Sequence, residues 1–230
     1  MAQCVEYQDQ GKVALITLDD GNVNAVSPSL LEQLNSALDT AESTQQVVVI
    51  TGREKRFSGG FDLSVMNQGG QAMIALVTGG ARLALRLATF KTPVVIACTG
   101  HSIAMGALLL LSADYRVAVD VDAKIGLNEV VIGLPLAYFG VELARARISA
   151  KYLSRAVNNG EIFSPQGALA AGYVDEVVPP EQLLETSLQR AQQLSHLNMA
   201  AHYETKLRLR ADLIKGMQWG IDNEFKNFPA

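Results

Sequence analysis

The sequence has few of the residues that mark several large classes of protein. Its two cysteines, Cys4 and Cys98, are too far apart in sequence for a disulfide framework, which fits a reducing compartment. The net charge is −4 and no long basic run occurs, so nucleic acid is not expected as the main partner. No spacing of His, Cys and Asp residues suggests a metal site.

Long apolar runs are missing as well. The most apolar stretch, Ile103 to Leu111, is too short to span a bilayer. The first residues have neither the basic nor the apolar segment of a signal peptide. We therefore expect a cytoplasmic protein that does not insert into a membrane. Apolar residues make up 49% of the chain and charged residues 18%, which predicts a large folded core.

Strand and helix patterns alternate along the chain. Alternation of polar and apolar residues predicts a hairpin at 4–9 and 12–18, and short apolar runs predict buried strands at 47–50, 94–97, 115–119 and 174–178. Helical spacing predicts helices at 28–43, 143–157, 181–197 and 199–225, and a kink or mobile segment at Gly79-Gly80 in a further helix. These elements predict an α/β fold with sheet layers covered by helices.

The stretch from Cys98 to Pro135 carries the chemistry. A buried strand ends at Cys98, and a very apolar helix is predicted to begin near Ala104. The free N–H groups at a helix N-terminus suit an anion or a developing oxyanion. Glu129 follows among apolar neighbours, and such surroundings raise the pKa of a carboxyl group towards the range that proton transfer needs.

Four motifs occur in a fixed order. Residues 57–63 read FSGGFDL, 100–106 read GHSIAMG, 113–117 read ADYRV and 125–129 read IGLNE. In this order they resemble the crotonase superfamily, the enoyl-CoA hydratase/isomerase family, over about residues 5–195. The first two motifs look like its oxyanion-hole loops. The last is similar to the segment that carries the catalytic glutamate of Δ3,Δ2-enoyl-CoA isomerases.

The resemblance implies a crotonase-like spiral of ββα turns, an architecture shared with Clp-type proteases. It implies a core over residues 1–195 and a C-terminal helical region over residues 196–230, which packs on the core or on a neighbouring subunit. A homotrimer or a dimer of trimers is expected. The ligand implied is an acyl-CoA thioester, with coenzyme A as part of the substrate and no permanently bound cofactor.

The resemblance also implies roles for individual residues. Glu129 would be catalytic, and the backbone N–H groups of Phe61 and Met105 would form the oxyanion hole. The residues implied to bind the coenzyme A part of the substrate are Asn24, Ala25, Val26, Gly59, Gly60 and Asp62. Arg53, Lys55 and Arg56 are candidate phosphate contacts. His101, in the second loop, is interpreted as structural.

Two departures from the family pattern bear on the reaction. Hydratases carry a second glutamate at the position of Leu108, and Met105 stands where the family usually has glycine. Adding water needs two groups to handle protons, whereas moving a double bond needs one base. We therefore expect Δ3 to Δ2 enoyl-CoA isomerisation with Glu129 as the proton shuttle. The alternatives are a hydratase that uses Glu142 as a second carboxylate and a non-catalytic thioester-binding homologue.

Overall fold

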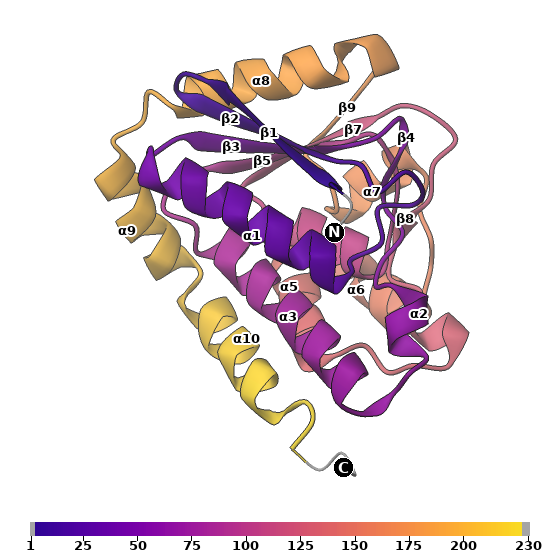
Figure 1. Ribbon diagram of the computed structural model, residues 1–230. Helices are drawn as coiled ribbons and strands as arrows, with labels where there is room; N and C mark the ends of the chain where they lie inside the picture. Colours follow the sequence, from indigo (N-terminus) through magenta and orange to yellow (C-terminus); the bar gives the residue numbers. More distant parts are fainter. Residues whose placement is uncertain (1–2, 227–230) are drawn as a thin grey trace.

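A six-stranded sheet runs through the middle of the protein, of which the computed structural model describes residues 3–226 (Figure 1). Across the sheet the strands are β1 (Val5–Gln10), β2 (Val13–Leu18), β3 (Val47–Gly52), β5 (Val94–Cys98), β7 (Tyr115–Val119) and β9 (Glu176–Val178). β1 and β2 form the predicted antiparallel hairpin, and each later pair is parallel. The α/β fold class predicted from the sequence is confirmed.

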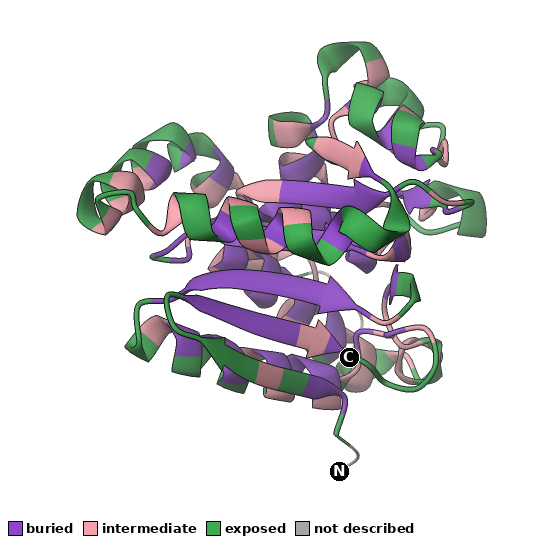
Figure 2. Ribbon diagram, turned by 90° about the horizontal axis from the view of Figure 1, so that it is seen from above, coloured by how far each residue is buried: buried purple, intermediate pink, exposed green. Residues whose placement is uncertain are grey.

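The central strands are buried on both faces, which explains their continuous apolar sequence. Val13 and Leu15 of β2 pack in a cluster with α8 (Leu183–Leu194), whereas Ala14 and Ile16 face the larger core on the other side. Figure 1 shows α8 above the sheet and the other large helices below it. In Figure 2 the strands between these layers are almost wholly buried, except the two edge strands, β1, which is partly exposed, and β9, which is mostly intermediate.

The remaining helices cover the larger core. They are α1 (Pro28–Ser43), α2 (Leu63–Met66), α3 (Gly70–Ala88), α4 (Met105–Ser112), α5 (Tyr138–Arg147), α6 (Ala150–Val157), α7 (Pro165–Ala171), α9 (Met199–Leu209) and α10 (Ala211–Asn223), with short 3₁₀ turns at Val130–Ile132 and Pro180–Gln182. The α1 helix begins where predicted, because the Ser27 side chain accepts a hydrogen bond from the Leu30 N–H (3.2 Å). Within residues 3–226, no helix has the length and apolarity needed to cross a membrane.

Two helices predicted as continuous are each broken in two. The predicted helix at 143–157 is interrupted at Ile148, whose backbone is extended, and the next N–H, that of Ser149, bonds to the Ala171 carbonyl (2.9 Å). The predicted helix at 199–225 is interrupted at Arg210, whose guanidinium reaches into the core. In both places a long-range contact decides the break, and helical spacing alone does not report it.

The glycine pair in α3 does not produce the predicted kink, because α3 is helical throughout. Both glycines instead allow close packing. A methyl group on Gly79 would lie 2.8 Å from Cδ1 of Leu31, and one on Gly80 would lie 2.5 Å from the ring of Phe61. The face of α3 that carries these glycines therefore packs against Leu31 of α1 at Gly79 and against the Phe61 side chain at Gly80.

A second, three-stranded sheet stands beside the first. Its strands are β4 (Lys55–Ser58), β6 (Gly100–Ile103) and β8 (Ile125–Gly126), in that order and all parallel. With two to four residues each, these strands are too short to show a periodic pattern in the sequence. From the sequence, the residues of β4 and β6 were interpreted as loops, and no strand was predicted at β8.

Buried charges tie the C-terminal helices to the core. Lys206 of α9 pairs with Asp114 (2.7 Å), and Arg210 pairs with the other oxygen of the same carboxylate (3.0 Å). Arg210 also donates to the Ser112 and Ala113 carbonyls at the C-terminal end of α4, and Arg147 donates to the Ala113 carbonyl (2.7 Å). The α10 helix lies against α3 and α5 (Figure 1).

Candidate active site

The small sheet brings the predicted site residues together. Ser58, Ser102 and Ile125 are aligned across its three parallel strands. Because parallel strands end at the same edge, the residues that follow them are neighbours in space. The segments that follow the three strands contain Phe61, Met105 and Glu129.

The first segment is held by the loop that contains Val26. The Val26 N–H donates to the Gly60 carbonyl (2.8 Å), and the Asp62 N–H donates to the Val26 carbonyl (3.1 Å). In this parallel pairing the Phe61 N–H points away from Val26, and it has no hydrogen-bond acceptor among the described residues. Asp62 then caps α2 by accepting from the Ser64 N–H (2.8 Å). The result is a fixed turn with one free backbone donor.

The second segment is the start of α4. Ala104 precedes the helix with φ 52° and ψ −120°, a conformation that costs a non-glycine residue about 1–3 kcal/mol. Its N–H is bound to the Gly126 carbonyl (3.0 Å) and its carbonyl accepts from the Leu108 N–H (3.0 Å). Met105 is the first helical residue, so its N–H has no acceptor within the helix. The strained turn thus directs a free N–H out of the helix end.

The two turns are in contact. A methyl group on Gly60 would lie 3.1 Å from Cβ of Ala104 and 3.7 Å from the Met105 nitrogen. Gly106 lies even closer to Ser58, because a methyl group there would collide with the Ser58 carbonyl oxygen and lie 2.9 Å from the Ser58 Cβ. The two N–H groups predicted for an oxyanion hole therefore belong to turns that meet directly.

Glu129 lies just after the third strand, at the start of the 3₁₀ turn Val130–Ile132. Its carbonyl accepts from the Leu134 N–H (2.9 Å), which closes the loop around it. The carboxyl oxygen Oε2 is inaccessible and has no hydrogen-bond partner within residues 3–226. Burial raises the pKa of Glu129, against a smaller opposing effect of its own backbone N–H. Such a carboxyl group suits the transfer of a proton near neutral pH.

Apolar side chains surround the start of α4. Leu108 is 2% exposed, and both its Cδ1 and that of Leu136 lie close to the bare face of Gly140 in α5. The Met105 side chain is buried and its terminal methyl approaches Gly80 of α3, beside the Phe61 ring. Where hydratases of this family would carry a second glutamate, the protein has a leucine packed against leucine and glycine.

The predicted coenzyme A segments form one connected loop next to Phe61. Asn24 is fully buried, has a φ of 53°, and donates its amide hydrogens to the carbonyls of Leu18, Arg56 and Phe57. Gly59 donates its N–H to the Val23 carbonyl (2.8 Å). The Asn24 side chain is thus used inside the protein, and Val26 and Gly60 are buried with their backbone groups bonded to each other and to Asp62, so Ala25 and Gly59 are the accessible members of the set. Their role in binding stays a prediction.

Two of the three basic residues adjoin this loop, since Arg53 donates to the Asn22 carbonyl (3.1 Å) and the Arg56 carbonyl accepts from the Asn24 amide (3.1 Å). Lys55 and Arg56 are at the amino end of β4, and Arg56 is aligned with His101 of β6, at the edge opposite to Phe61. Arg53 is near Asp19 (3.6 Å). His101 accepts from the Lys124 N–H (3.0 Å), and burial together with the charges of Arg56 and Lys124 lowers its pKa. This agrees with the structural interpretation of His101.

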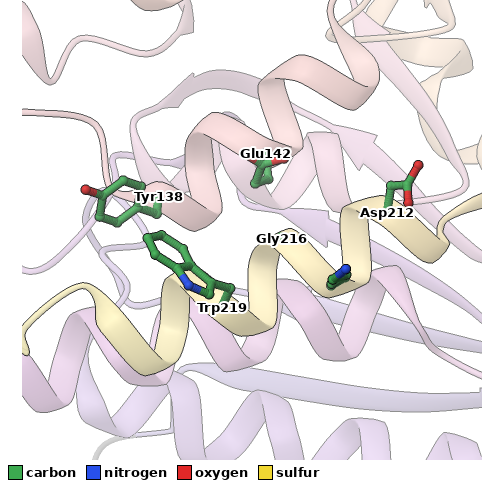
Figure 3. Close-up of a pocket in the computed structure, with 6 residues that line it drawn as sticks. Tyr138, Glu142, Asp212, Gly216 and Trp219 are labelled. Atoms are coloured by element: carbon green, nitrogen blue, oxygen red, sulfur yellow. The ribbon is translucent and has the colours of Figure 1, made fainter.

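Glu142 faces a different pocket. It lies on α5 against Gly216 of α10 and pairs with Arg145 (2.6 Å). It lines a pocket of about 280 Å³ between the two helices. Figure 3 shows Tyr138 and Trp219 at one end of this pocket. Nothing in this arrangement joins it to Glu129. In the described part of the chain, no group of three His, Cys, Asp or Glu side chains is placed to hold a metal ion.

Sequence reasoning missed one buried polar residue whose pKa is affected by the charge of Glu129. Tyr173 is fully buried, and its pKa is raised by burial and by the charge of Glu129. It lies between α7 and β9, 44 residues after Glu129, within a short apolar run. No local pattern signals its position, because only the folded chain brings it within reach of that charge.

Comparisons with known proteins agree with this geometry. The family model described as enoyl-CoA hydratase/isomerase matches residues 8–229. The chain is similar to a crystal structure of an enoyl-CoA hydratase/isomerase family protein from Pseudomonas syringae, with 43% identity, 98% coverage of each chain and a TM-score of 0.96. Human mitochondrial delta3-delta2-enoyl-CoA isomerase is 29% identical, with a TM-score of 0.93, over 98% of this chain and 90% of the other. The 2,3-dehydroadipyl-CoA hydratase of Escherichia coli K12 is 31% identical, over 95% of this chain and 86% of that protein.

Proposed function

Because the chain belongs to the enoyl-CoA hydratase/isomerase family, we propose that it acts on an acyl-CoA thioester and moves the double bond from the 3,4 to the 2,3 position. The thioester oxygen lies between the N–H groups of Phe61 and Met105 in this proposal. Both groups belong to turns that touch, and both are free to donate within the described structure. Donors fixed in this way stabilise charge without reorganising during the reaction.

Glu129 supplies the proton transfers. As a carboxylate it removes a proton from C2 of the 3-enoyl thioester, which gives a dienolate whose oxygen is held by the two N–H groups. The resulting carboxylic acid then delivers the same proton to C4, the double bond shifts to the 2,3 position and the carboxylate is regenerated. The raised pKa of Glu129 brings its two protonation states closer in energy, as this cycle needs.

The observation that carries the choice of isomerisation is the packing of Leu108. A hydratase needs one group to orient and deprotonate water and another to manage the proton at carbon. Leu108 is buried against Leu136 at Gly140, so at this position the protein offers neither a second carboxylate nor a polar group to hold water. A single base is enough for isomerisation.

Hydration is the second candidate, because relatives named as hydratases are as similar to this chain as the isomerases. It would need a second carboxylate, for which Glu142 was the candidate. Glu142 instead pairs with Arg145 and faces α10. A non-catalytic thioester-binding protein is the third candidate, and it predicts no exchange of solvent deuterium at C2 of a bound acyl-CoA.

The coenzyme A part of the substrate is proposed to lie along the loop 24–26 and residues 59–62. Because the Asn24 amide is fully engaged in the protein, the contacts would come from backbone groups of Ala25, Gly59 and Phe61. A trimeric assembly is likewise proposed. Light scattering after gel filtration tests it directly.

The test of the function is Glu129→Gln, assayed with 3-enoyl-CoA and with 2-enoyl-CoA plus water. The amide keeps the shape of the side chain and removes the base, so isomerisation should fall by about 10²–10⁴-fold. Glu142→Gln is the matched control, since it changes a carboxyl group on the neighbouring α5 and should leave isomerisation unchanged. Wild-type turnover in Glu129→Gln would refute the assignment, and hydration lost in Glu142→Gln would establish the second candidate.

A further inference from the structure

Gly80 is a buried residue at the middle of α3. A methyl group there would lie 2.5 Å from Cε1 and 2.6 Å from Cζ of the Phe61 ring, and 3.4 Å from the terminal methyl of Met105. Phe61 and Met105 are the two residues whose N–H groups are proposed to form the oxyanion hole. The side chains of both donor residues therefore contact the same bare stretch of helix backbone.

The two donor residues are thus held together at two places. Their turns meet where Gly60 faces Ala104 and the Met105 nitrogen, and their side chains meet again at Gly80. One contact alone would leave the turns able to rotate about it. A second contact, on a separate element, limits that rotation and so fixes the direction of the N–H groups.

The α3 helix is a firm support for the second contact. Its buried residues, among them Leu83 and Leu87, are part of the larger core. Near its C-terminal end, Arg86 donates to Oδ1 of Asn35 (2.8 Å) and pairs with Asp39 (2.6 Å), both on α1. Core packing and these bonds together hold the helix in place beneath the two turns.

The need for space explains the glycine at position 80. Gly80 is helical and has no positive φ, so its backbone conformation does not require glycine. Alanine is the better helix former, and it would be favoured here if the two side chains were absent. The adjacent Gly79 faces another way, because a methyl group there meets Cδ1 of Leu31 on α1 (2.8 Å) and neither donor residue.

We propose that Gly80 is a positioning residue for the oxyanion hole, whose bare backbone holds the side chains of Phe61 and Met105 and thereby their N–H groups. The inference rests on the proposed function, in which these N–H groups bind the thioester oxygen. An alanine at position 80 would push the Phe61 ring by about 1 Å, because non-bonded carbon atoms pack about 3.5–4.0 Å apart. The contact with Met105 is already at an ordinary distance, so the two donors would move by different amounts.

The test is Gly80→Ala, with Gly79→Ala as the matched control. Both substitutions add one methyl group to the same helix and raise its helical propensity, but only the first presses on the donor residues. We expect kcat for 3-enoyl-CoA to fall about 10- to 100-fold in Gly80→Ala, with little change in KM, since a misplacement of about 1 Å can cost about 100-fold in rate. Gly79→Ala should keep the wild-type kcat. If the Phe61 ring swings into solvent without moving its backbone, Gly80→Ala keeps the wild-type kcat and the proposal is overturned.

A double-mutant cycle separates this effect from general damage to α3. Phe61→Leu shortens the side chain that faces Gly80 and keeps the backbone N–H. Adding Gly80→Ala to Phe61→Leu should lower kcat by less than about threefold, because the smaller side chain leaves room for the methyl group. An equal loss in both backgrounds would show that the Phe61 side chain does not carry the effect, and it would overturn the proposal.

A further measurement does not depend on turnover. Acetoacetyl-CoA forms an enolate that absorbs in the ultraviolet, and an intact oxyanion hole lowers the pH at which the bound ligand ionises. That pH should be higher in Gly80→Ala than in the wild type and unchanged in Gly79→Ala. Equal ionisation in Gly80→Ala and the wild type would overturn the role of Gly80, even if kcat fell. Failure of the proposed function shows separately, as wild-type turnover in Glu129→Gln.

Discussion

Replacing Gly60 with alanine tests whether the contact between the two turns sets the rate. Gly60 has a φ of 97°, and its Cα faces Ala104 and the Met105 nitrogen. An added methyl group would lie 3.1 Å from the Ala104 Cβ and 3.2 Å from the Ile103 carbonyl oxygen. Both distances are a few tenths of an ångström shorter than ordinary contacts, so the turns must separate.

Two effects of this substitution have different sizes and different assays. The positive φ costs an alanine about 1–2 kcal/mol, which urea denaturation measures as a loss of stability. Separating the turns misaligns the Phe61 and Met105 donors. Removing one such donor outright costs about 10²–10³-fold in rate, so a displacement of a few tenths of an ångström should lower kcat about 10- to 100-fold.

Gly21→Ala separates the two effects. Gly21 also has a positive φ, of 77°, but a methyl group there meets nothing within 4 Å. It should lose a similar amount of stability and keep the wild-type kcat. If Gly60→Ala also kept the wild-type kcat while losing stability, the turns would not form the oxyanion hole and the reasoning would be refuted.

Two further predictions concern charge. Burial raises the pKa of Glu129 above its ordinary 4.5, so the folded protein favours the protonated carboxyl group. The stability that the protonated group contributes is therefore lost as pH rises through the raised pKa. Glu129→Gln should therefore be more stable than the wild type at pH 7.5 and not at pH 4; urea denaturation at both values tests this, and an equal difference at both would contradict it. Asp114→Asn leaves Lys206 and Arg210 without their carboxylate and should cost about 3–5 kcal/mol, whereas Asp39→Asn, at an exposed pair with Arg86, should cost at most about 1 kcal/mol. A loss below about 1 kcal/mol for Asp114→Asn in thermal unfolding would show that the cluster is not essential.

Regular elements were predictable where one face or both faces are buried along their length. The α1 helix and the strands of the large sheet have this property, so periodicity and apolar runs located them. The breaks at Ile148 and Arg210 were not predictable, because each depends on a partner far along the chain. The uninterrupted α3 was mispredicted for the same reason: Gly79 and Gly80 serve the packing of Leu31 and Phe61 and do not weaken the helix.

Only those residues of the candidate site that lie within the sequence motifs were predictable. The resemblance pointed to Phe61, Met105 and Glu129, and the register of the small sheet shows why three distant segments meet. Its strands are too short for any pattern to reveal, so the sheet itself was missed. The packing of Leu108 against Leu136 and the effect of the Glu129 charge on Tyr173 arise from the tertiary structure alone.

The α4 helix connects the proposed oxyanion donor at its first residue to two arginines at its last turn, Arg147 of α5 and Arg210 between α9 and α10. It is eight residues long, so about 12 Å separate the Met105 N–H from the carbonyls that Arg147 and Arg210 hold. Positive charge at that far end offsets the negative pole of the helix. Shortening the protein before Arg210, or grafting its core onto another scaffold, therefore changes the support of the proposed oxyanion donor without changing any residue of the candidate site. For engineering purposes, the unit to keep intact extends to the junction of α9 and α10.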